Sequence, residues 1–223
     1  MPGARNKGVL LLMATIAATF AQAAWAGDLS GTPDSGHPPG MLHGPAVASV
    51  SVCFVPEQEC DAPVVQAIAA AKTFIRVQAY GFTSRVILSA LAGARARGLD
   101  VQAILDKSDD RPDREDQPGR NRRIVGARFT AQANIPTWID DSVAIAHNKV
   151  IIIDGHLVIG GSYNYTASAE HRNAENITFI DAPVVADFYL LNWEARKAAS
   201  RLSRFQSGAD DDAARTVASA QSR

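Results

Sequence analysis

The feature that most constrains the fold is a regular alternation of strand-like and helix-like segments between residues 47 and 108. Three segments are rich in β-branched or other apolar residues, which is typical of strands; they cover residues 47–56, 73–83 and 99–108. The two segments between them carry apolar side chains at helical spacing; they cover residues 61–72 and 84–98. Alternation of this kind favours a layered α/β fold with parallel strand pairing.

Helical end signals support the second of these helices, because it starts on Ser84 and ends on Gly98. Farther along the chain, residues 175–180 form a short strand pattern and residues 183–205 a long amphipathic helix pattern. The apolar residues expected on one buried side of this helix are Val184, Val185, Phe188, Tyr189 and Trp193. The elements together predict a mixed sheet flanked by helices.

An Asp154-Gly155 pair between two apolar runs predicts a β-hairpin with a two-residue turn. In that register Ile153 faces His156. The same register places His147 opposite Ser162 and Lys149 opposite Gly160.

Side chains two residues apart share a face of a strand, so His147, Lys149 and Ser162 should meet at the open end of the hairpin. Asn164 lies two residues beyond Ser162, on the same side if the strand continues. Residues 160 and 161 are both glycine, which would let backbone approach a ligand closely.

These residue types suit an anion that carries several oxygen atoms. An imidazole is a nucleophile or a base near neutral pH. Ammonium, hydroxyl and amide groups donate hydrogen bonds to phosphate oxygens. The segment has no cluster of carboxylates that would hold a metal ion, so metal-assisted chemistry is disfavoured and no cofactor is expected.

The segment 147–164 resembles the signature of the phospholipase D superfamily, which reads His-x-Lys, four residues, Asp, six residues, Gly-Ser-x-Asn. The fixed positions are filled by His147, Lys149, Asp154, Gly161, Ser162 and Asn164. Segments 76–84, 105–108 and 168–180 are similar to the small secreted or periplasmic endonucleases of this superfamily, which carry one motif. The resemblance covers about residues 50–205 and implies an α/β/α sandwich with a mixed sheet.

The resemblance also implies a mechanism. His147 would attack phosphorus and form a covalent phosphohistidine. Lys149 and Asn164 would hold the non-bridging oxygens, with assistance from Ser162. No metal ion takes part in this mechanism.

Two acidic residues have different expected roles: the resemblance gives a role to Glu175, and the hairpin gives one to Asp154. Glu175, eleven residues after Asn164, would orient the second ring nitrogen of His147, as a carboxylate orients histidine in other enzymes. Asp154 belongs to the signature, but the hairpin places it at the turn, away from His147. We therefore expect Asp154 to have a structural role.

A second histidine must protonate the leaving oxygen. Larger members of the superfamily supply it from a second copy of the motif, but the residues after His156 and His171 do not continue as the signature. The resemblance therefore implies a homodimer with a shared active site, in which each subunit contributes one His147. A two-fold interface allows this because it brings the same surface patch to itself.

The N-terminal segment, residues 1–26, has the pattern of a secretory signal. Arg5 and Lys7 precede an apolar run, and small residues lead up to Ala26, after which we expect cleavage. A retained membrane anchor is the alternative, although the run is short for a span of about 20 residues. We expect a secreted or periplasmic protein with no stable membrane anchor after cleavage.

Composition shifts divide the rest of the chain. The leader is rich in Gly, Pro and Ser, and the tail is small and polar. The expected divisions are a flexible leader at 27–48, a phosphodiesterase domain at 49–206 and a disordered tail at 207–223.

The two cysteines, Cys53 and Cys60, lie seven residues apart. In an oxidising compartment such a pair is expected to form a disulfide. Two free thiols are the first alternative. A metal site is the second, although zinc needs more ligands than this pair.

The net charge of −1 argues against a protein that grips nucleic acid with its whole surface. Between residues 111 and 128, however, six arginines face three acidic residues. This stretch is either a solvated loop or a rim that attracts phosphate.

The sequence favours a metal-independent phosphodiesterase, most of all a non-specific endonuclease that hydrolyses DNA and, as a further substrate, RNA. A phospholipase D that cleaves lipid head groups is the first alternative. A nucleic-acid-binding module without catalysis is the second.

Overall fold

The computed structural model describes residues 49–110 and 126–206. The expected signal segment, leader and tail lie outside these residues, as do residues 111–125 of the arginine-rich stretch. The elements in chain order are β1 (Ser49–Val55), α1 (Asp61–Ala70), β2 (Phe74–Ala79), α2 (Arg85–Ala96), β3 (Asp100–Asp106), the short 3₁₀ helix η1 (Lys107–Asp110), α3 (Gly126–Gln132), β4 (Thr137–Asp140), β5 (Val150–Ile153), β6 (Leu157–Gly161), α4 (Ala167–Arg172), β7 (Glu175–Asp181), α5 (Pro183–Ala198) and β8 (Arg201–Leu202).

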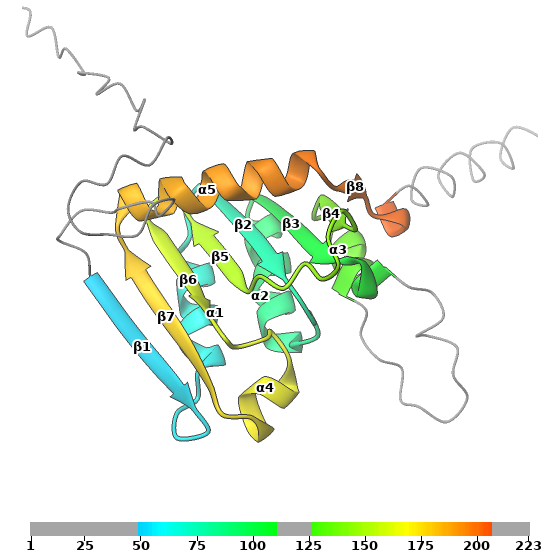
Figure 1. Cartoon of the computed structure of the whole chain (residues 1–223). Helices are drawn as coiled ribbons and strands as arrows, with labels where there is room; N and C mark the ends of the chain where they lie inside the picture. Colours follow the sequence, from blue (N-terminus) through cyan, green and yellow to red (C-terminus); the bar gives the residue numbers. More distant parts are fainter. Residues whose placement is uncertain (1–48, 111–125, 207–223) are drawn as a thin grey trace, which may run out of the picture. The chain divides into compact units, whose positions relative to one another are not determined.

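The strands form one eight-stranded mixed sheet in the order β1-β7-β6-β5-β2-β3-β4-β8 (Figure 1). The parallel pairing expected from the alternation holds for β2 with β3, and β4 extends it. Strand β1 departs from it, because β1 lies at the sheet edge and pairs antiparallel with β7. That register puts Cys53 opposite Ile177, and both side chains are buried in the core.

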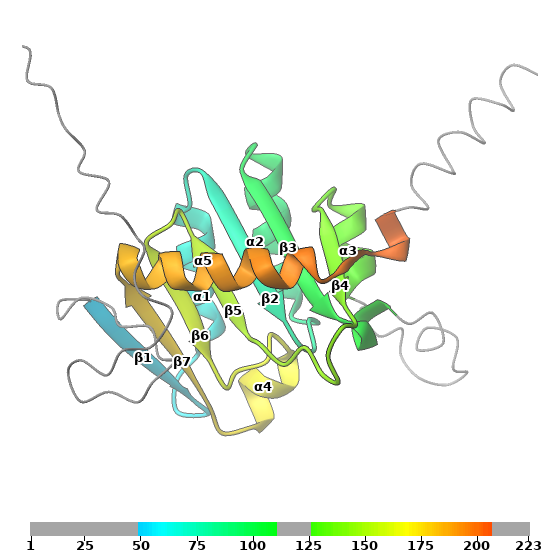
Figure 2. The same ribbon diagram turned by 45° about the horizontal axis from the view of Figure 1, so that its top comes forward.

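Helices cover both faces of the sheet (Figures 1 and 2). Helices α1, α2 and α3 pack on one face over the larger core, to which Ile68, Leu91 and Ile151 contribute. Helix α5 crosses the other face over a smaller core built around Trp193 and Ile152. The predicted α/β/α sandwich with a mixed sheet is therefore confirmed.

The predicted ends of α2 agree with the structure. The Ser84 side chain accepts a hydrogen bond from the backbone N–H of Ile87, as an N-cap residue does. Gly98 follows the helix with a φ of +94°, a conformation that favours glycine. The sequence signals at both ends of this helix are thus realised by local backbone geometry.

The β5–β6 hairpin differs from its predicted register by one residue. Asp154 and Gly155 have positive φ, and the Ile153 carbonyl accepts from the His156 N–H, as in the predicted turn. The first ladder pair, however, is Ile153 with Leu157, so His156 belongs to the loop.

The backbone of His156, which lies outside the ladder, makes a contact with another part of the chain. Its carbonyl accepts a hydrogen bond from the N–H of Ala182, between β7 and α5, instead of pairing back with Ile153. The ladder ends at Val150 opposite Gly160. The predicted facing pairs His147–Ser162 and Lys149–Gly160 are therefore wrong, and His147 and Lys149 precede the ladder.

Helix α5 is shorter than predicted, because it ends at Ala198 and not at residue 205. Arg201 and Ser203 each donate a 2.8 Å hydrogen bond to the buried carboxylate of Asp110, which draws the chain into β8 beside β4. Trp193 is buried as expected, whereas Tyr189 remains 37% exposed. No helix within residues 49–110 and 126–206 is long and apolar enough to cross a membrane.

Candidate active site

His147 and Lys149 lie together at the end of the loop that leads into β5. The Lys149 side chain is only 6% exposed, and its Nζ lies 2.8 Å from Nδ1 and 3.0 Å from Nε2 of His147. The same ammonium donates to the His147 carbonyl at 2.7 Å. The imidazole itself is exposed, so an incoming group can reach it while the lysine charge stays beside it.

Tyr80 belongs to this site, although the sequence analysis gave it no role. Its ring lies against the His147 ring, with centroids 4.7 Å apart, and Lys149 Nζ lies 5.5 Å from the Tyr80 centroid. Tyr80 follows β2, far from the signature in sequence. The signal that could have found it is the segment 76–84, which contains Tyr80 and resembles the family outside the main motif.

Ser162 and Glu175 form a second part of the site. Ser162 Oγ donates to Glu175 Oε2 at 2.5 Å, and it accepts from the Asn176 N–H at 3.1 Å. Asn173 Nδ2 donates to the other carboxylate oxygen of Glu175 at 2.8 Å. Serine hydroxyl and carboxylate therefore meet where β6 ends and β7 begins.

The expected hydrogen bond from His147 to Glu175 is not made among the described residues. Both oxygens of the Glu175 carboxylate are bound by neighbours on its own side, Ser162 and Asn173. Glu175 still acts on the other half of the site through its charge. Burial lowers the pKa of Lys149, and the negative charge of Glu175 opposes that change.

Asn164 lies beside Gly81, the residue after Tyr80. Its Oδ1 atom is buried and has no hydrogen-bond partner within the described chain. Leaving a buried polar atom unpaired costs about 1–3 kcal/mol. Such an atom in a native structure calls for an explanation, and a bound group that donates a hydrogen bond to the amide oxygen would supply one.

Gly161 serves the fold rather than a close approach to ligand. Its φ is +151°, and a Cβ atom built there would overlap the backbone carbonyl oxygen of Asn176 on β7. A side chain at this position would push β6 away from β7. Glycine is thus needed at the end of β6, where the segment that carries Ser162 and Asn164 leaves the sheet.

Asp154 lies at the turn, at the opposite end of β5 from His147. Its carboxylate accepts hydrogen bonds from the N–H groups of Lys72, Thr73 and Phe74, and from the Thr73 hydroxyl. Burial alone would raise the pKa of Asp154, but these hydrogen bonds outweigh it and lower that pKa. Asp154 therefore fastens the hairpin to the start of β2.

A cavity of about 300 Å³ opens beside His147, on the side of the sheet that α5 covers. Its polar lining includes Asn148, which donates to Gln78 at 2.5 Å, and the ion pair of Arg196 with Asp140. The loop that forms its other wall includes Val143 and Ile145, which are 36% and 56% exposed. The exposed imidazole of His147 therefore adjoins a cavity with both polar and apolar walls.

The parts of the site come from four separate regions of the chain. The loop before β5 supplies the imidazole and the ammonium, and the segment after β2 supplies Tyr80. The segment after β6 supplies Ser162 and Asn164, and the start of β7 supplies Glu175. Within the described residues, no three His, Cys, Asp or Glu side chains gather as metal ligands would.

Sequence comparison connects this arrangement to known proteins. The family described as "Cardiolipin synthase, PLD-like domain" matches residues 64–194. The chain is 40% identical over 158 residues to a protein named phospholipase D from Rickettsia prowazekii, a match that covers 71% of this chain and 72% of that protein. A protein of the same name from Rickettsia bellii is 40% identical over 68% of this chain and 70% of its own length.

Structure comparison agrees with the sequence matches. Nuc from Salmonella typhimurium, described as a phospholipase D family member, superposes with a TM-score of 0.62 and 35% identity, covering 71% of this chain and 99% of Nuc. NucT from Helicobacter pylori superposes with a TM-score of 0.57 and 21% identity, covering 70% of this chain and 99% of NucT. At the latter identity the similarity concerns the fold alone.

Proposed function

The chain belongs to the phospholipase D superfamily and is a phosphodiester hydrolase, and from this premise we propose that it is a metal-independent endonuclease that hydrolyses DNA, with RNA as a further substrate. The relatives named phospholipase D favour an enzyme over a binding module without catalysis. The remaining question is which phosphodiester the site accepts.

The proposed reaction has two displacements at phosphorus. In the first, a ring nitrogen of His147 forms a bond to phosphorus, the bond from phosphorus to the leaving oxygen breaks, and a second imidazole gives that oxygen a proton. In the second, that imidazole takes a proton from water as the water oxygen attacks phosphorus and releases His147.

Three residues would stabilise the charge that builds on the phosphoryl oxygens. Lys149 supplies a buried ammonium beside the imidazole, and an ion in a water-poor site interacts strongly with developing charge. Asn164 would add a neutral donor, and Ser162 would add another once its hydroxyl hydrogen turns from Glu175 to phosphate. Glu175 would hold the Ser162 hydroxyl before substrate binds and would balance the charge of Lys149.

The observation that carries the choice of nucleic acid is the group of polar side chains among the residues that line the cavity beside His147. Neutral amides at Gln78 and Asn148 and the internally balanced Arg196–Asp140 pair suit an uncharged polar group such as a nucleoside. Acyl chains would meet these polar groups without satisfying their hydrogen bonds.

A second candidate is hydrolysis of phospholipid head groups. The Rickettsia relatives carry the name phospholipase D. The outer side of edge strand β1 also exposes a stripe of apolar side chains, formed by Val50, Val52 and Phe54. Such a stripe could contact a lipid surface.

We also propose that the protein acts as a homodimer with a shared active site. The described chain carries one signature, and the mechanism needs two imidazoles. Val143 and Ile145 expose apolar surface a few residues before His147, where a second copy of the same patch would cover it. One His147 would attack phosphorus while its counterpart protonates the leaving oxygen.

Secretion or residence in the periplasm is the proposed location, with cleavage after Ala26. The disulfide between Cys53 and Cys60 supports an oxidising compartment, since such bonds are rare in reducing ones.

The first experiment is nicking of supercoiled plasmid by the purified protein in excess EDTA. Phosphatidylcholine hydrolysis is measured in parallel. His147→Asn is compared with His156→Asn, because His156 belongs to the same hairpin but lies at its far end, paired with Asp181. We expect nicking to persist in EDTA, to vanish in His147→Asn and to survive in His156→Asn.

Each other outcome changes the assignment. Release of choline with intact plasmid would show that the protein is a phospholipase D and not a nuclease. Loss of nicking in EDTA would contradict the metal-free mechanism. Equal loss in both histidine variants would show that His147 has no special role.

A further inference from the structure

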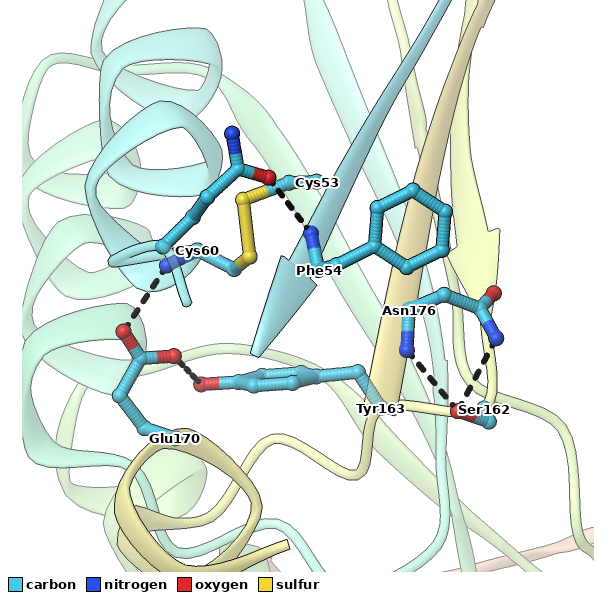
Figure 3. Close-up of a disulfide and its surroundings, with 8 residues drawn as sticks. Cys53, Phe54, Cys60, Ser162, Tyr163, Glu170 and Asn176 are labelled. Atoms are coloured by element: carbon cyan, nitrogen blue, oxygen red, sulfur yellow. Dashed lines mark hydrogen bonds between the residues drawn. A yellow bond between two sulfur atoms is a disulfide. The ribbon is translucent and has the colours of Figure 1, made fainter. Parts of the chain in front are cut away.

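The loop that carries Ser162 and Asn164 is anchored by the residue between them. The Tyr163 side chain is buried, and its hydroxyl donates to Glu170 Oε2 at 2.7 Å (Figure 3). Glu170 lies in α4 and is only 6% exposed. A buried carboxylate needs hydrogen-bond donors, so this contact fixes both side chains.

The second oxygen of Glu170 connects the loop to the disulfide. Glu170 Oε1 accepts from the backbone N–H of Cys60 at 2.9 Å, and Cys60 is bonded to Cys53 on β1 (Figure 3). The path from the disulfide through Glu170 to Tyr163 is therefore continuous. We call these four residues, Cys53, Cys60, Glu170 and Tyr163, the disulfide relay.

The position of Tyr163 determines the position of its neighbours. Its backbone N–H donates to the Asn176 carbonyl at 3.4 Å, and Ser162 Oγ accepts from the Asn176 N–H. Gly161, two residues before Tyr163, has a positive φ that residues other than glycine rarely adopt. The loop is thus held at Gly161, by Asn176 and by the buried Tyr163 hydroxyl. Beyond Asn164, the Tyr165 carbonyl accepts hydrogen bonds from the backbone N–H groups of Thr83 and Ser84.

We propose that Tyr163 and Glu170 are positioning residues for the hydrolysis reaction, and that the Cys53–Cys60 disulfide holds them in place, so that breaking it lowers turnover in the folded protein. The proposal rests on the proposed function in one respect, namely that Ser162 and Asn164 bind the phosphate. Neither Tyr163 nor Glu170 touches substrate in this scheme.

The physical basis is the sensitivity of catalysis to small displacements. A misplacement of about 1 Å can cost roughly a hundredfold in rate. Loss of one relay contact should move the loop less than that, so we expect about a tenfold decrease in kcat.

A matched pair of variants separates this role from general packing. Tyr163→Phe removes the hydroxyl that contacts Glu170. Tyr165→Phe removes another buried hydroxyl two residues away, which has no hydrogen-bond partner in the described chain. We expect kcat for bis(p-nitrophenyl) phosphate to fall about tenfold in Tyr163→Phe, with little change in KM, and to stay at the wild-type value in Tyr165→Phe.

Reduction tests the disulfide end of the relay. Dithiothreitol gives two electrons and two protons to the Cys53–Cys60 bond, which becomes two thiols, and is itself oxidised to its cyclic disulfide. Reduction should lower kcat several-fold in the wild type. In Tyr163→Phe it should lower kcat less than about twofold, because contacts in one network are not additive.

Conservative replacement supplies a further check. In Glu170→Gln the amide oxygen can still accept from the Cys60 N–H, and the amide nitrogen can donate to the Tyr163 oxygen. This variant should keep most of the wild-type kcat, whereas Glu170→Ala should lose as much as Tyr163→Phe. All assays are run at a temperature where circular dichroism shows every variant to be folded.

A readout without turnover keeps the inference independent of the choice of substrate. The side-chain amide resonance of Asn164, followed by ¹⁵N NMR, should shift on reduction in the wild type and much less in Tyr163→Phe. Equal kcat in the two tyrosine variants, or an Asn164 resonance that ignores reduction, would overturn the inference. A wild type that hydrolyses no phosphodiester but shows the resonance shift would contradict the proposed function and leave the relay supported.

Discussion

At the scale of single residues, the charge of Lys149 favours the proposed function but destabilises the folded protein. Its ammonium is buried against the imidazole and carbonyl of His147 and not against a carboxylate. Burial lowers the pKa of Lys149, which means that the folded state disfavours the charged form. The charge that would bind phosphate is therefore a cost to the folded protein in the absence of substrate.

Replacing Lys149 by methionine should raise the free energy of unfolding and lower kcat. The lowered pKa makes the cost fully present below the folded pKa, and the cost disappears as pH rises toward 10.5, the value in the unfolded chain. At neutral pH, Lys149→Met should thus gain up to about 1 kcal/mol of stability while kcat falls at least about a hundredfold. Thermal unfolding and kcat for bis(p-nitrophenyl) phosphate test both halves. A destabilised variant would show that the lysine charge contributes to folding.

At the scale of elements, the hairpin turn is fastened to β2 by one carboxylate. Asp154 accepts from three successive backbone N–H groups, so the turn and the start of the neighbouring strand are held as a unit. These bonds lower the pKa of Asp154 below 3.8 despite its burial. Their contribution to stability is then fully present above pH 3.8 and is lost as pH falls through the folded pKa.

Two substitutions separate the charge of Asp154 from its shape. Asp154→Ala should cost about 2 kcal/mol, because it leaves the donors unpaired, and because alanine tolerates the φ of +53° poorly. Asp154→Asn keeps the left-handed conformation and one acceptor, so it should cost about half as much. Urea unfolding between pH 3 and 7 measures both, and the wild type should lose its advantage over Asp154→Asn at the acid end. An advantage that does not vary with pH would contradict the role given to the carboxylate.

The same hairpin shows what the sequence could and could not predict. Its turn was predicted from Asp154-Gly155, and the signature side chains of the candidate site were predicted from their fixed spacings. Both signals are local in sequence. The register was predicted one residue out, because the local turn signal carries no information on contacts such as the hydrogen bond from the Ala182 N–H to the His156 carbonyl, twenty-six residues apart in the chain. Tyr80 was missed for a similar reason, since the antiparallel pairing of β2 with β5 brings the end of β2 beside His147.

The predicted helices show the same difference between local signals and contacts distant in sequence. The pattern predicted α2 with both of its ends, because its caps are local. It placed the end of α5 too far along the chain, because the buried Asp110 carboxylate binds Arg201 and Ser203 and starts β8. The partner of Glu175 was also set by a neighbour, Ser162, and not by the histidine that the resemblance implied. Contacts distant in sequence thus account for each of these differences.

At the scale of the whole molecule, one signature per chain makes assembly part of the proposed mechanism. If two copies share a site, a dimer of one wild-type subunit and one His147→Asn subunit has either a nucleophile without an acid or an acid without a nucleophile. Such heterodimers are obtained by co-expressing the two chains with different tags and purifying through both. We expect their plasmid-nicking rate to be below about 1% of the wild-type dimer, since removal of either partner of an acid–nucleophile pair abolishes the shared step. Two independent sites would instead give about half of the wild-type rate, because one complete site would remain.

The interface itself is tested by Val143→Asp. Val143 is 36% exposed and lines the cavity beside His147, so a charge at this position would lie within the apolar patch that we expect the second copy to cover. Burying a charged carboxylate in this apolar patch should convert the dimer into monomers in analytical ultracentrifugation and remove nicking with it. A monomer that still nicks plasmid would show that a single His147 serves as both nucleophile and acid in turn.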